Sequence, residues 1–226
     1  MKYIIFDAGP LINFAMNGII PILKDLKKEF NGKFLITPSI KNETIDHPEK
    51  IKRFELEALR LEELFNEKIL ELPKLTKQQN HELEKTTKDF MNLANSIFKA
   101  KRKNLHLIDK GEAEVLALAT LLKEKNVVLA IDERTTRMLC ENPENLKKLL
   151  EKKLHTKIEF NKKNTAYFEK FKIIRSTELI YMANKKNLIK IKDPRAYEAM
   201  LYAVKFKGTS ISEKEVLEML KIENNQ

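Results

Sequence analysis

The chain has 226 residues and a net charge of +10, the difference between 43 Lys and Arg and 33 Asp and Glu. Hydrophobic residues make up 42% of it, which excludes a disordered chain and predicts a well-formed core. No apolar run reaches the roughly 20 residues of a membrane span, and Asp7 interrupts the apolar opening too early for a secretory signal. The single cysteine, Cys140, excludes an internal disulfide. We therefore expect a cytoplasmic protein that does not span a membrane.

The excess of positive charge gives information about the binding partners of the protein rather than about its fold. A basic chain is attracted to polyanions, so nucleic acid is the first candidate partner and an anionic membrane surface the second. A Lys-rich surface that serves only solubility explains the same charge equally well. The choice therefore depends on candidate sites.

The first half of the chain alternates short apolar runs with helical patterns. In chain order these are a strand at 2–6, a short helix at 11–15, a helix at 22–30, a strand at 33–37, a helix capped by Ser39, a helical stretch at 48–65, a strand at 68–72 and a helix from Thr76 to Ala100. We interpret the helices within residues 49–103 as a helical hairpin inserted into the main fold.

The second half repeats the alternation. It predicts a helix at 112–125, a strand at 127–131 that is apolar throughout, a helical run at 134–154 interrupted by Pro143, a strand at 171–174, a helix at 178–187 and two further helices. Strands that alternate with helices predict a single α/β domain over residues 1–226 with a central, mostly parallel sheet. The last two helices would form a C-terminal helical extension at about 190–226.

Acidic residues stand at the ends of these predicted elements. Asp7 ends the first strand, Asp132 ends the strongest one, Glu112 follows a Gly turn, and Glu43 lies early in a helix. Ligands of open parallel sheets bind beyond the carboxyl ends of the strands, where such residues would meet. Converging carboxylates repel one another unless a cation neutralises them, and ligation by oxygen alone suits Mg²⁺ or Mn²⁺.

Each acid also has a purely structural explanation. Glu112 would favour the positive end of its helix, and Glu43 would occupy a solvated helical position. Asp132 and Glu133 could cap the next helix. Asp7 is harder to explain in this way, because a charge placed directly after a buried strand is costly without a partner.

Other chemistries fail on the sequence itself. A phosphatase of the haloacid-dehalogenase type needs a second Asp two positions after the first, and Gly9 stands there. Neither a Walker phosphate loop nor a Gly-rich dinucleotide motif is present. The four histidines show no paired metal spacing. Cys140 lies in a helical run and is explained best as a packed residue.

Each of these acids lies in one of four short sequence segments. They are Phe-Asp7-Ala-Gly-Pro-Leu-Ile-Asn13, Thr37-Pro-Ser-Ile-Lys-Asn-Glu43, Gly111-Glu-Ala-Glu-Val-Leu-Ala-Leu-Ala119 and Ile131-Asp-Glu-Arg-Thr-Thr-Arg137. In order and spacing they resemble the motifs of PIN-domain ribonucleases across most of the chain. The stretch 171–189 resembles the closing strand and helix of longer prokaryotic members. Gly9 departs from the pattern, because many members carry a hydroxyl residue there.

The resemblance implies a PIN-like three-layer α/β/α fold and a metal-dependent endoribonuclease. Asp7, Glu43, Glu112 and Asp132 would then be the catalytic acids and the ligands of Mg²⁺ or Mn²⁺, with Asp7 and Asp132 as the principal ligands. Glu114 is the alternative to Glu112 as the third acid, and Glu133 is a further candidate.

An acidic site that binds RNA needs a basic rim. Arg134 and Arg137 lie close to Asp132 in the sequence, and Lys99, Lys101, Arg102 and Lys103 form the densest basic cluster. We expect these groups to contact RNA phosphates. A solvated helix end is the alternative explanation for both groups, and the simpler one for the cluster.

Other functions compatible with the same motifs are an RNA-binding or protein-binding scaffold without activity, and a structure-specific DNA nuclease. Within the nuclease hypothesis, the chain is either a toxin with an antitoxin protein as partner or an RNA-processing enzyme. A second copy of the chain is a further candidate partner, since PIN proteins often dimerise.

Overall fold

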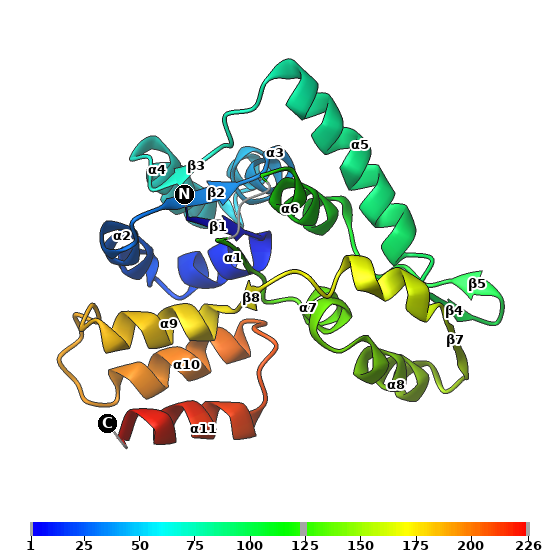
Figure 1. The fold of residues 1–226 in the computed structure, drawn as a ribbon. Coiled ribbons are helices and arrows are strands. Elements are labelled where there is room, and N and C mark those ends of the chain that lie inside the picture. Colours follow the sequence, from blue (N-terminus) through cyan, green and yellow to red (C-terminus); the bar gives the residue numbers. More distant parts are fainter. Residues whose placement is uncertain (1, 123–125, 225–226) are drawn as a thin grey trace.

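Five parallel strands form the central sheet of this computed structural model, which describes residues 2–122 and 126–224 (Figure 1). In sheet order they are β3 (Leu70–Glu71), β2 (Lys33–Ile36), β1 (Tyr3–Phe6), β6 (Val127–Ala130) and β8 (Ile173–Ile174). β1 lies in the middle and places Tyr3 opposite both Lys33 and Val127. The predicted α/β class with a parallel sheet is confirmed.

The core of the molecule is built around β1. Ile5 and Phe6 are fully buried, and the ring of Phe6 meets the edge of Phe34 on β2 at a centroid distance of 5.2 Å. Helices cover both faces of this sheet, so its central strands, β1 and β6, carry no charged residues on either side. This burial is the reason why the apolar runs at 2–6 and 127–131 could be recognised as strands.

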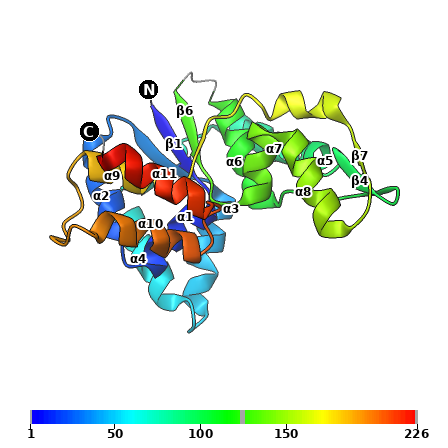
Figure 2. The same cartoon turned by 90° about the horizontal axis from the view of Figure 1, so that it is seen from below.

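Helices from distant parts of the chain make up the two outer layers. On one face lie α1 (Ala8–Met16), α2 (Ile20–Glu29), α4 (Glu55–Asn66) and α9 (Ser176–Lys185), and on the other lies α6 (Lys110–Leu121) with α5 (Lys77–Ala94) packed along it. Right-handed crossovers between parallel strands produce this division. Figure 2 shows α10 (Ala196–Phe206) and α11 (Glu213–Asn224), which occupy the predicted C-terminal extension, beside α9.

The inserted segment is not a helical hairpin, so that prediction was wrong. α4 packs against α1 and against two short turns, η1 (Asn42–Asp46) and η2 (Pro48–Lys50), whereas α5 packs along α6. Between the two helices, β3 joins the main sheet with Leu70 opposite Phe34. Leu70 is fully buried there, so pairing with β2 draws α4 and α5 to different parts of the fold.

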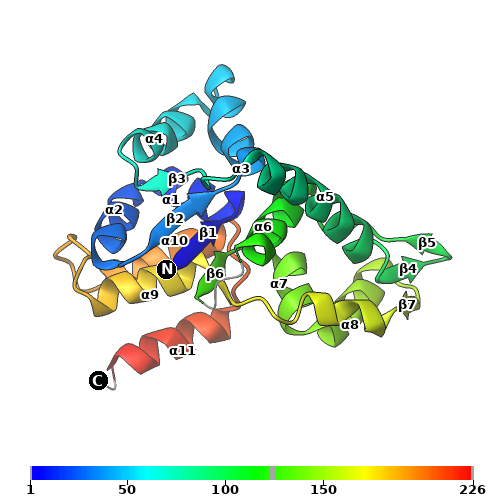
Figure 3. The same ribbon diagram turned by 45° about the horizontal axis from the view of Figure 1, so that its top comes forward.

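A second, three-stranded sheet replaces the predicted last turn of α5. The helix begins after Thr76, as expected, but ends at Ala94 instead of Ala100. The chain then forms β4 (Phe98–Ala100) and β5 (Lys103–Asn104), and β4 pairs with the distant β7 (Ile158–Phe160). The rings of Phe98 and Phe160 stack at 4.9 Å, a contact that no local helical pattern reveals. Figure 3 shows this sheet at the far end of α5.

The remaining elements connect these layers. α3 (Pro38–Lys41) follows β2 and is capped by the Thr37 hydroxyl rather than by Ser39. α7 (Arg134–Glu141), α8 (Pro143–Leu154) and η3 (Lys162–Tyr167) lie between β6 and β8. The predicted helix end at Lys125 falls outside the described residues. Across the described ranges, no helix is both long enough and apolar enough to cross a bilayer.

Candidate functional site

The predicted acids gather at the carboxyl edge of the central sheet. The chain leaves β1 for β2 on one side, and β6 occupies the other side, so the direction of winding changes between β1 and β6. Asp7 follows β1 directly, and Asp132 comes two residues after the end of β6. Such a switch point is the usual place for a ligand in an open parallel sheet.

Asp7 is buried at this edge. Its backbone N–H donates to the Ala130 carbonyl at 2.9 Å, which joins the ends of the two strands. Burial, followed by the charge of Glu112, raises the pKa of Asp7 to about 7, and Glu43 adds to this effect. The backbone amides of Ala8 and Gly9, at the start of α1, oppose the rise. Asp7 is therefore a carboxyl group that lacks a compensating cation.

Glu112 combines a structural position with a place beside Asp7. Its Oε2 accepts from the Asp109 N–H at 2.8 Å, which caps the start of α6, and its Oε1 accepts from the Thr136 hydroxyl. Burial nevertheless raises the pKa of Glu112 to about 7. The helix-terminal explanation and the functional one therefore both apply to this residue.

Glu43 approaches from η1, after β2. Its side chain is exposed, but its carboxylate lies against Gly111: a β-carbon on Gly111 would come within 3.1 Å of Glu43 Oε2 and equally close to Ile40. Loss of hydration, followed by the charge of Asp109, raises the pKa of Glu43. The missing side chain of Gly111 is what allows α6 and η1 to approach so closely.

Asp7, Glu43 and Glu112 form what we call the acid cluster. Its ligand atoms are carboxylate oxygens alone, the donors that Mg²⁺ and Mn²⁺ prefer. Within the part of the chain that the structure describes, no three His, Cys, Asp or Glu side chains stand together in the arrangement of a metal site. A bound metal therefore stays a prediction, supported here by the chemistry of the donors and by their raised pKa values.

Asp132 has entirely different surroundings. It is buried, and its carboxylate accepts four hydrogen bonds: from the Ser176 N–H at 2.8 Å, the Ser176 hydroxyl at 2.6 Å, the Asn13 amide at 2.7 Å and the Thr209 hydroxyl at 3.0 Å. The Ser210 N–H donates to the Asp132 carbonyl. Asp132 thereby fastens α1, the start of α9 and the α10–α11 connection to the end of β6.

This network changes the interpretation of Asp132, which the sequence predicts to be a principal metal ligand. Both carboxylate oxygens are occupied by donors from the chain itself. Gly9 separates the two aspartates: a β-carbon there would lie 3.3 Å from the Asp132 β-carbon and 3.7 Å from Asp7 Oδ2. Sequence reasoning missed Thr209 entirely. Asn13 ends the first motif-like segment, but its hydrogen bond to Asp132 could not be predicted from the sequence.

Glu114 and Glu133, the two additional acids that the sequence suggested, lie outside the acid cluster. Glu114 is buried on the side of α6 that faces α3 and α5, where its Oε2 accepts from the Ser39 N–H at 2.8 Å. Glu133 is exposed and caps α7, since its Oε2 accepts from the Thr136 N–H at 2.7 Å. The charge of Glu133 contributes to the raised pKa of Glu112.

The two arginines near Asp132 differ in their freedom to bind RNA. Arg134 is exposed and forms no ion pair with any described residue. Arg137 pairs with Glu141 at 3.2 Å and donates to the Ser210 carbonyl at 3.1 Å, so its guanidinium is held within the fold. Only Arg134 has the exposure expected of a phosphate contact.

The predicted basic cluster belongs to a larger surface that we call the basic lobe, residues 98–104 and 143–163. It contains β4, β5, α8 and β7, and it carries eleven Lys and Arg against three Glu, or +8 of the net +10. Lys101 and Arg102 are exposed in the β4–β5 turn and Lys103 is exposed at the start of β5, so none of them lies on a helix end. Figure 2 shows this lobe at the opposite end of the molecule from the C-terminal helices.

No protein-family model, curated protein or solved structure matches this chain. The resemblance to PIN-domain ribonucleases therefore rests on the sequence motifs alone. An antitoxin and a second copy of the chain likewise stay predictions.

Proposed function

We propose that this protein is a metal-dependent endoribonuclease with a PIN-like three-layer fold, and that its acid cluster is the catalytic centre. The observation that supports this proposal most strongly concerns Asp7, which follows β1. Its burial, together with the nearby charges of Glu112 on α6 and Glu43 after β2, raises its pKa to about 7. Structural ion pairs do the opposite and lower the pKa of their acids. Uncompensated carboxylates at a strand switch point are typical of functional sites.

Asp7, Glu43 and Glu112 would hold Mg²⁺ or Mn²⁺. When bound, such a cation polarises a phosphodiester and lowers the pKa of a bound water. Asp132 would act as a positioning residue, because its hydrogen bonds set the place of α1 and hence of Asp7.

The chain supplies the orientation of these acids itself. The Thr136 hydroxyl and the Asp109 N–H each bind one oxygen of Glu112, so the carboxylate is held at both ends. Gly111 keeps Glu43 close to α6. Such fixed geometry reduces the rearrangement that is needed when substrate binds.

RNA would be held by Arg134 and by the basic lobe. Lys101 and Arg102 form the two-residue β4–β5 turn with φ of 48° and 67°. Asn and Gly are the residues that this left-handed turn prefers. Two long cations occupy it instead, and strained positions of this kind favour a functional explanation for the side chains. The lobe would bind the backbone without reading sequence.

Cleavage of a mixed panel tests the proposal: single-stranded RNA, structured RNA, single-stranded DNA and flap DNA, each with Mn²⁺, Mg²⁺ or EDTA. We expect metal-dependent cutting of RNA by the wild type. Asp7→Asn and Glu112→Gln should each lower the rate by on the order of a hundredfold, as loss of one charge-stabilising group does.

Asp89→Asn serves as the matched control, since Asp89 is exposed on α5 and should leave the rate unchanged. Cutting that persists in Asp7→Asn would indicate a contaminant. Cutting of DNA alone would favour the DNA nuclease. RNA binding without any cutting would favour the scaffold.

A further inference from the structure

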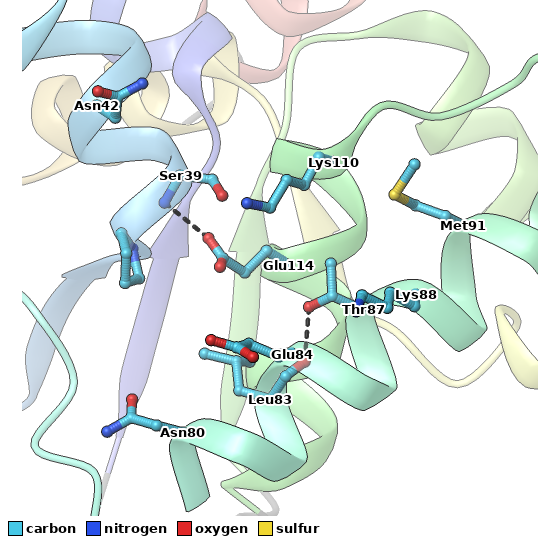
Figure 4. Close-up of a pocket in the computed structure, with 11 residues that line it drawn as sticks. Ser39, Asn42, Asn80, Leu83, Glu84, Thr87, Lys88, Met91, Lys110 and Glu114 are labelled. Carbon is cyan, nitrogen blue, oxygen red and sulfur yellow. Dashed lines mark hydrogen bonds between the residues drawn. The ribbon is translucent and has the colours of Figure 1, made fainter. Parts of the chain in front are cut away.

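A cavity of about 840 Å³ lies between α3, α5 and α6. Figure 4 shows Ser39 and Asn42 on one wall, side chains of α5 on another, and Lys110 and Glu114 on α6. This volume falls in the range of small-ligand sites, about 300–1,000 Å³. Asn42 adjoins Glu43 in sequence, and Lys110 precedes Glu112 by two positions, so η1 and α6 contribute residues both to the cavity and to the acid cluster.

Two cations are available at this cavity. Lys88 on α5 and Lys110 on α6 line it, both are exposed, and neither pairs with an acid in residues 2–122 or 126–224. Several other lysines of the chain do form such pairs, as the exposed Lys52 does with Glu55 at 3.0 Å. Unpaired ammonium groups on a concave surface are suited to a phosphate.

The other residues that line the cavity favour a ligand with more functional groups than a phosphate. Glu114 is buried and binds the Ser39 N–H through Oε2, and no described residue binds its Oε1. Leu83 and Met91 supply an apolar part of the surface. A phosphate alone would leave both features unused. A nucleotide carries an anionic phosphate, N–H donors for a carboxylate and an apolar base face, so it matches all three.

We propose that this cavity binds one nucleotide of a single-stranded RNA next to the scissile phosphate. Lys88 and Lys110 hold the backbone phosphates, Glu114 accepts from the base or from a ribose hydroxyl, and Met91 contacts the base. The assignment to RNA rests on the proposed nuclease function, whereas the nucleotide chemistry rests on the cavity itself. A base within a duplex is stacked and cannot enter, so the cavity selects single strands.

Binding measured without turnover tests this inference separately from cleavage. A labelled single-stranded RNA of about ten nucleotides is titrated in EDTA against wild type, Lys88→Ala, Lys110→Ala and the double variant. Each loss of a phosphate contact should weaken binding about fivefold near 0.1 M salt and lower the salt slope by about 0.7. Lys85→Ala is the matched control, since Lys85 is exposed on the same helix but does not line the cavity.

Competitors identify the ligand. Displacement by nucleoside monophosphates shows that a free nucleotide suffices, whereas resistance to them shows that the strand is required. Both results support a nucleotide site. Displacement by inorganic phosphate as effective as that by nucleotides overturns it, and so does equal binding of duplex and single-stranded RNA.

Failure of this inference can be told apart from failure of the proposed function. If the double variant binds like Lys85→Ala while the wild type cleaves RNA, the cavity assignment is wrong and the nuclease stands. If binding depends on both lysines but no RNA is cut, the cavity assignment stands and the nuclease is wrong. A wild type that binds no single-stranded RNA overturns the cavity assignment.

Discussion

Asp7 and Asp132 follow adjacent parallel strands, and both are buried at the same sheet edge. Asp132 receives four hydrogen bonds from Asn13, Ser176 and Thr209. Asp7 instead lies near Glu112 and Glu43, and its burial, followed by the charges of these two acids, raises its pKa. The fold therefore stabilises the charge of one aspartate and leaves the other uncompensated. A buried charge stabilises a fold only where donors or cations surround it, so the two carboxylates serve different purposes.

The largest effect that this comparison predicts is the loss of stability when Asp132, which accepts four hydrogen bonds, is replaced. Asp132→Ala removes the acceptor of four buried donors, and we expect it to lower the free energy of unfolding by about 3–5 kcal/mol. Urea unfolding measures the change. Asp193→Ala is the control, because Asp193 is an exposed residue paired with Arg195. Equal stability of the two variants would contradict the structural role of Asp132.

Replacement of Asp7 should change the stability in the opposite direction. The folded chain binds the Asp7 proton more tightly than the unfolded chain, since the pKa rises from 3.8 to about 7. Its contribution to stability is therefore most favourable below the unfolded pKa and falls as the pH rises toward 7. In EDTA near pH 8, Asp7→Asn should be more stable than the wild type by on the order of 4 kcal/mol.

The measurement is urea unfolding at acidic and at mildly alkaline pH. The advantage of Asp7→Asn should shrink at the lower pH, where the wild-type carboxyl group is already protonated. Asp132→Asn removes the same charge from a carboxylate that accepts four hydrogen bonds. This variant should be less stable than the wild type at both pH values. A loss of stability in Asp7→Asn at every pH would refute the comparison.

Divalent metal ions should cancel the loss of stability that the ionised Asp7 carboxylate causes in the wild type. At a hundredfold excess over Kd, Mn²⁺ or Mg²⁺ should stabilise the wild type by about 2.7 kcal/mol. The gain should be smaller below the pKa of Asp7, because protons compete with the metal for the same carboxylates. Melting temperatures with and without metal measure it. Stabilisation that survives in Asp7→Asn and Glu112→Gln would place the ion elsewhere.

The smallest effect on stability concerns the spacing of the acid cluster. Gly111→Ala pushes on the carboxylate of the exposed Glu43 and on the end of the buried Ile40 side chain. Because Ala favours a helix, the stability should change by no more than about 1 kcal/mol. The displaced carboxylate should lower RNA cleavage about tenfold. In a Glu43→Gln background the same substitution should cost nothing further, and a full additional loss would show that Gly111 acts otherwise.

The sequence by itself determined the parallel sheet and the acids at its edge. The runs at 2–6 and 127–131 are apolar on both faces, and each is followed by an aspartate, so a local pattern was enough to find them. Elements with clear local caps, such as α5 after Thr76, were also found.

Only the tertiary structure decided how each acid is used. Asp132 meets Asn13 across 119 positions and Thr209 across 77, and the paired residues of β4 and β7 are 58 to 62 positions apart. Such contacts leave no periodic trace in the chain, because hydrogen-bond partners and short antiparallel strands are chosen by proximity in space rather than by local spacing. The same limitation applies to Glu112 and Glu114, two positions apart on α6. The sequence favoured Glu112 as the third acid, but only the structure shows that Glu112 lies near Asp7 whereas Glu114 faces α3.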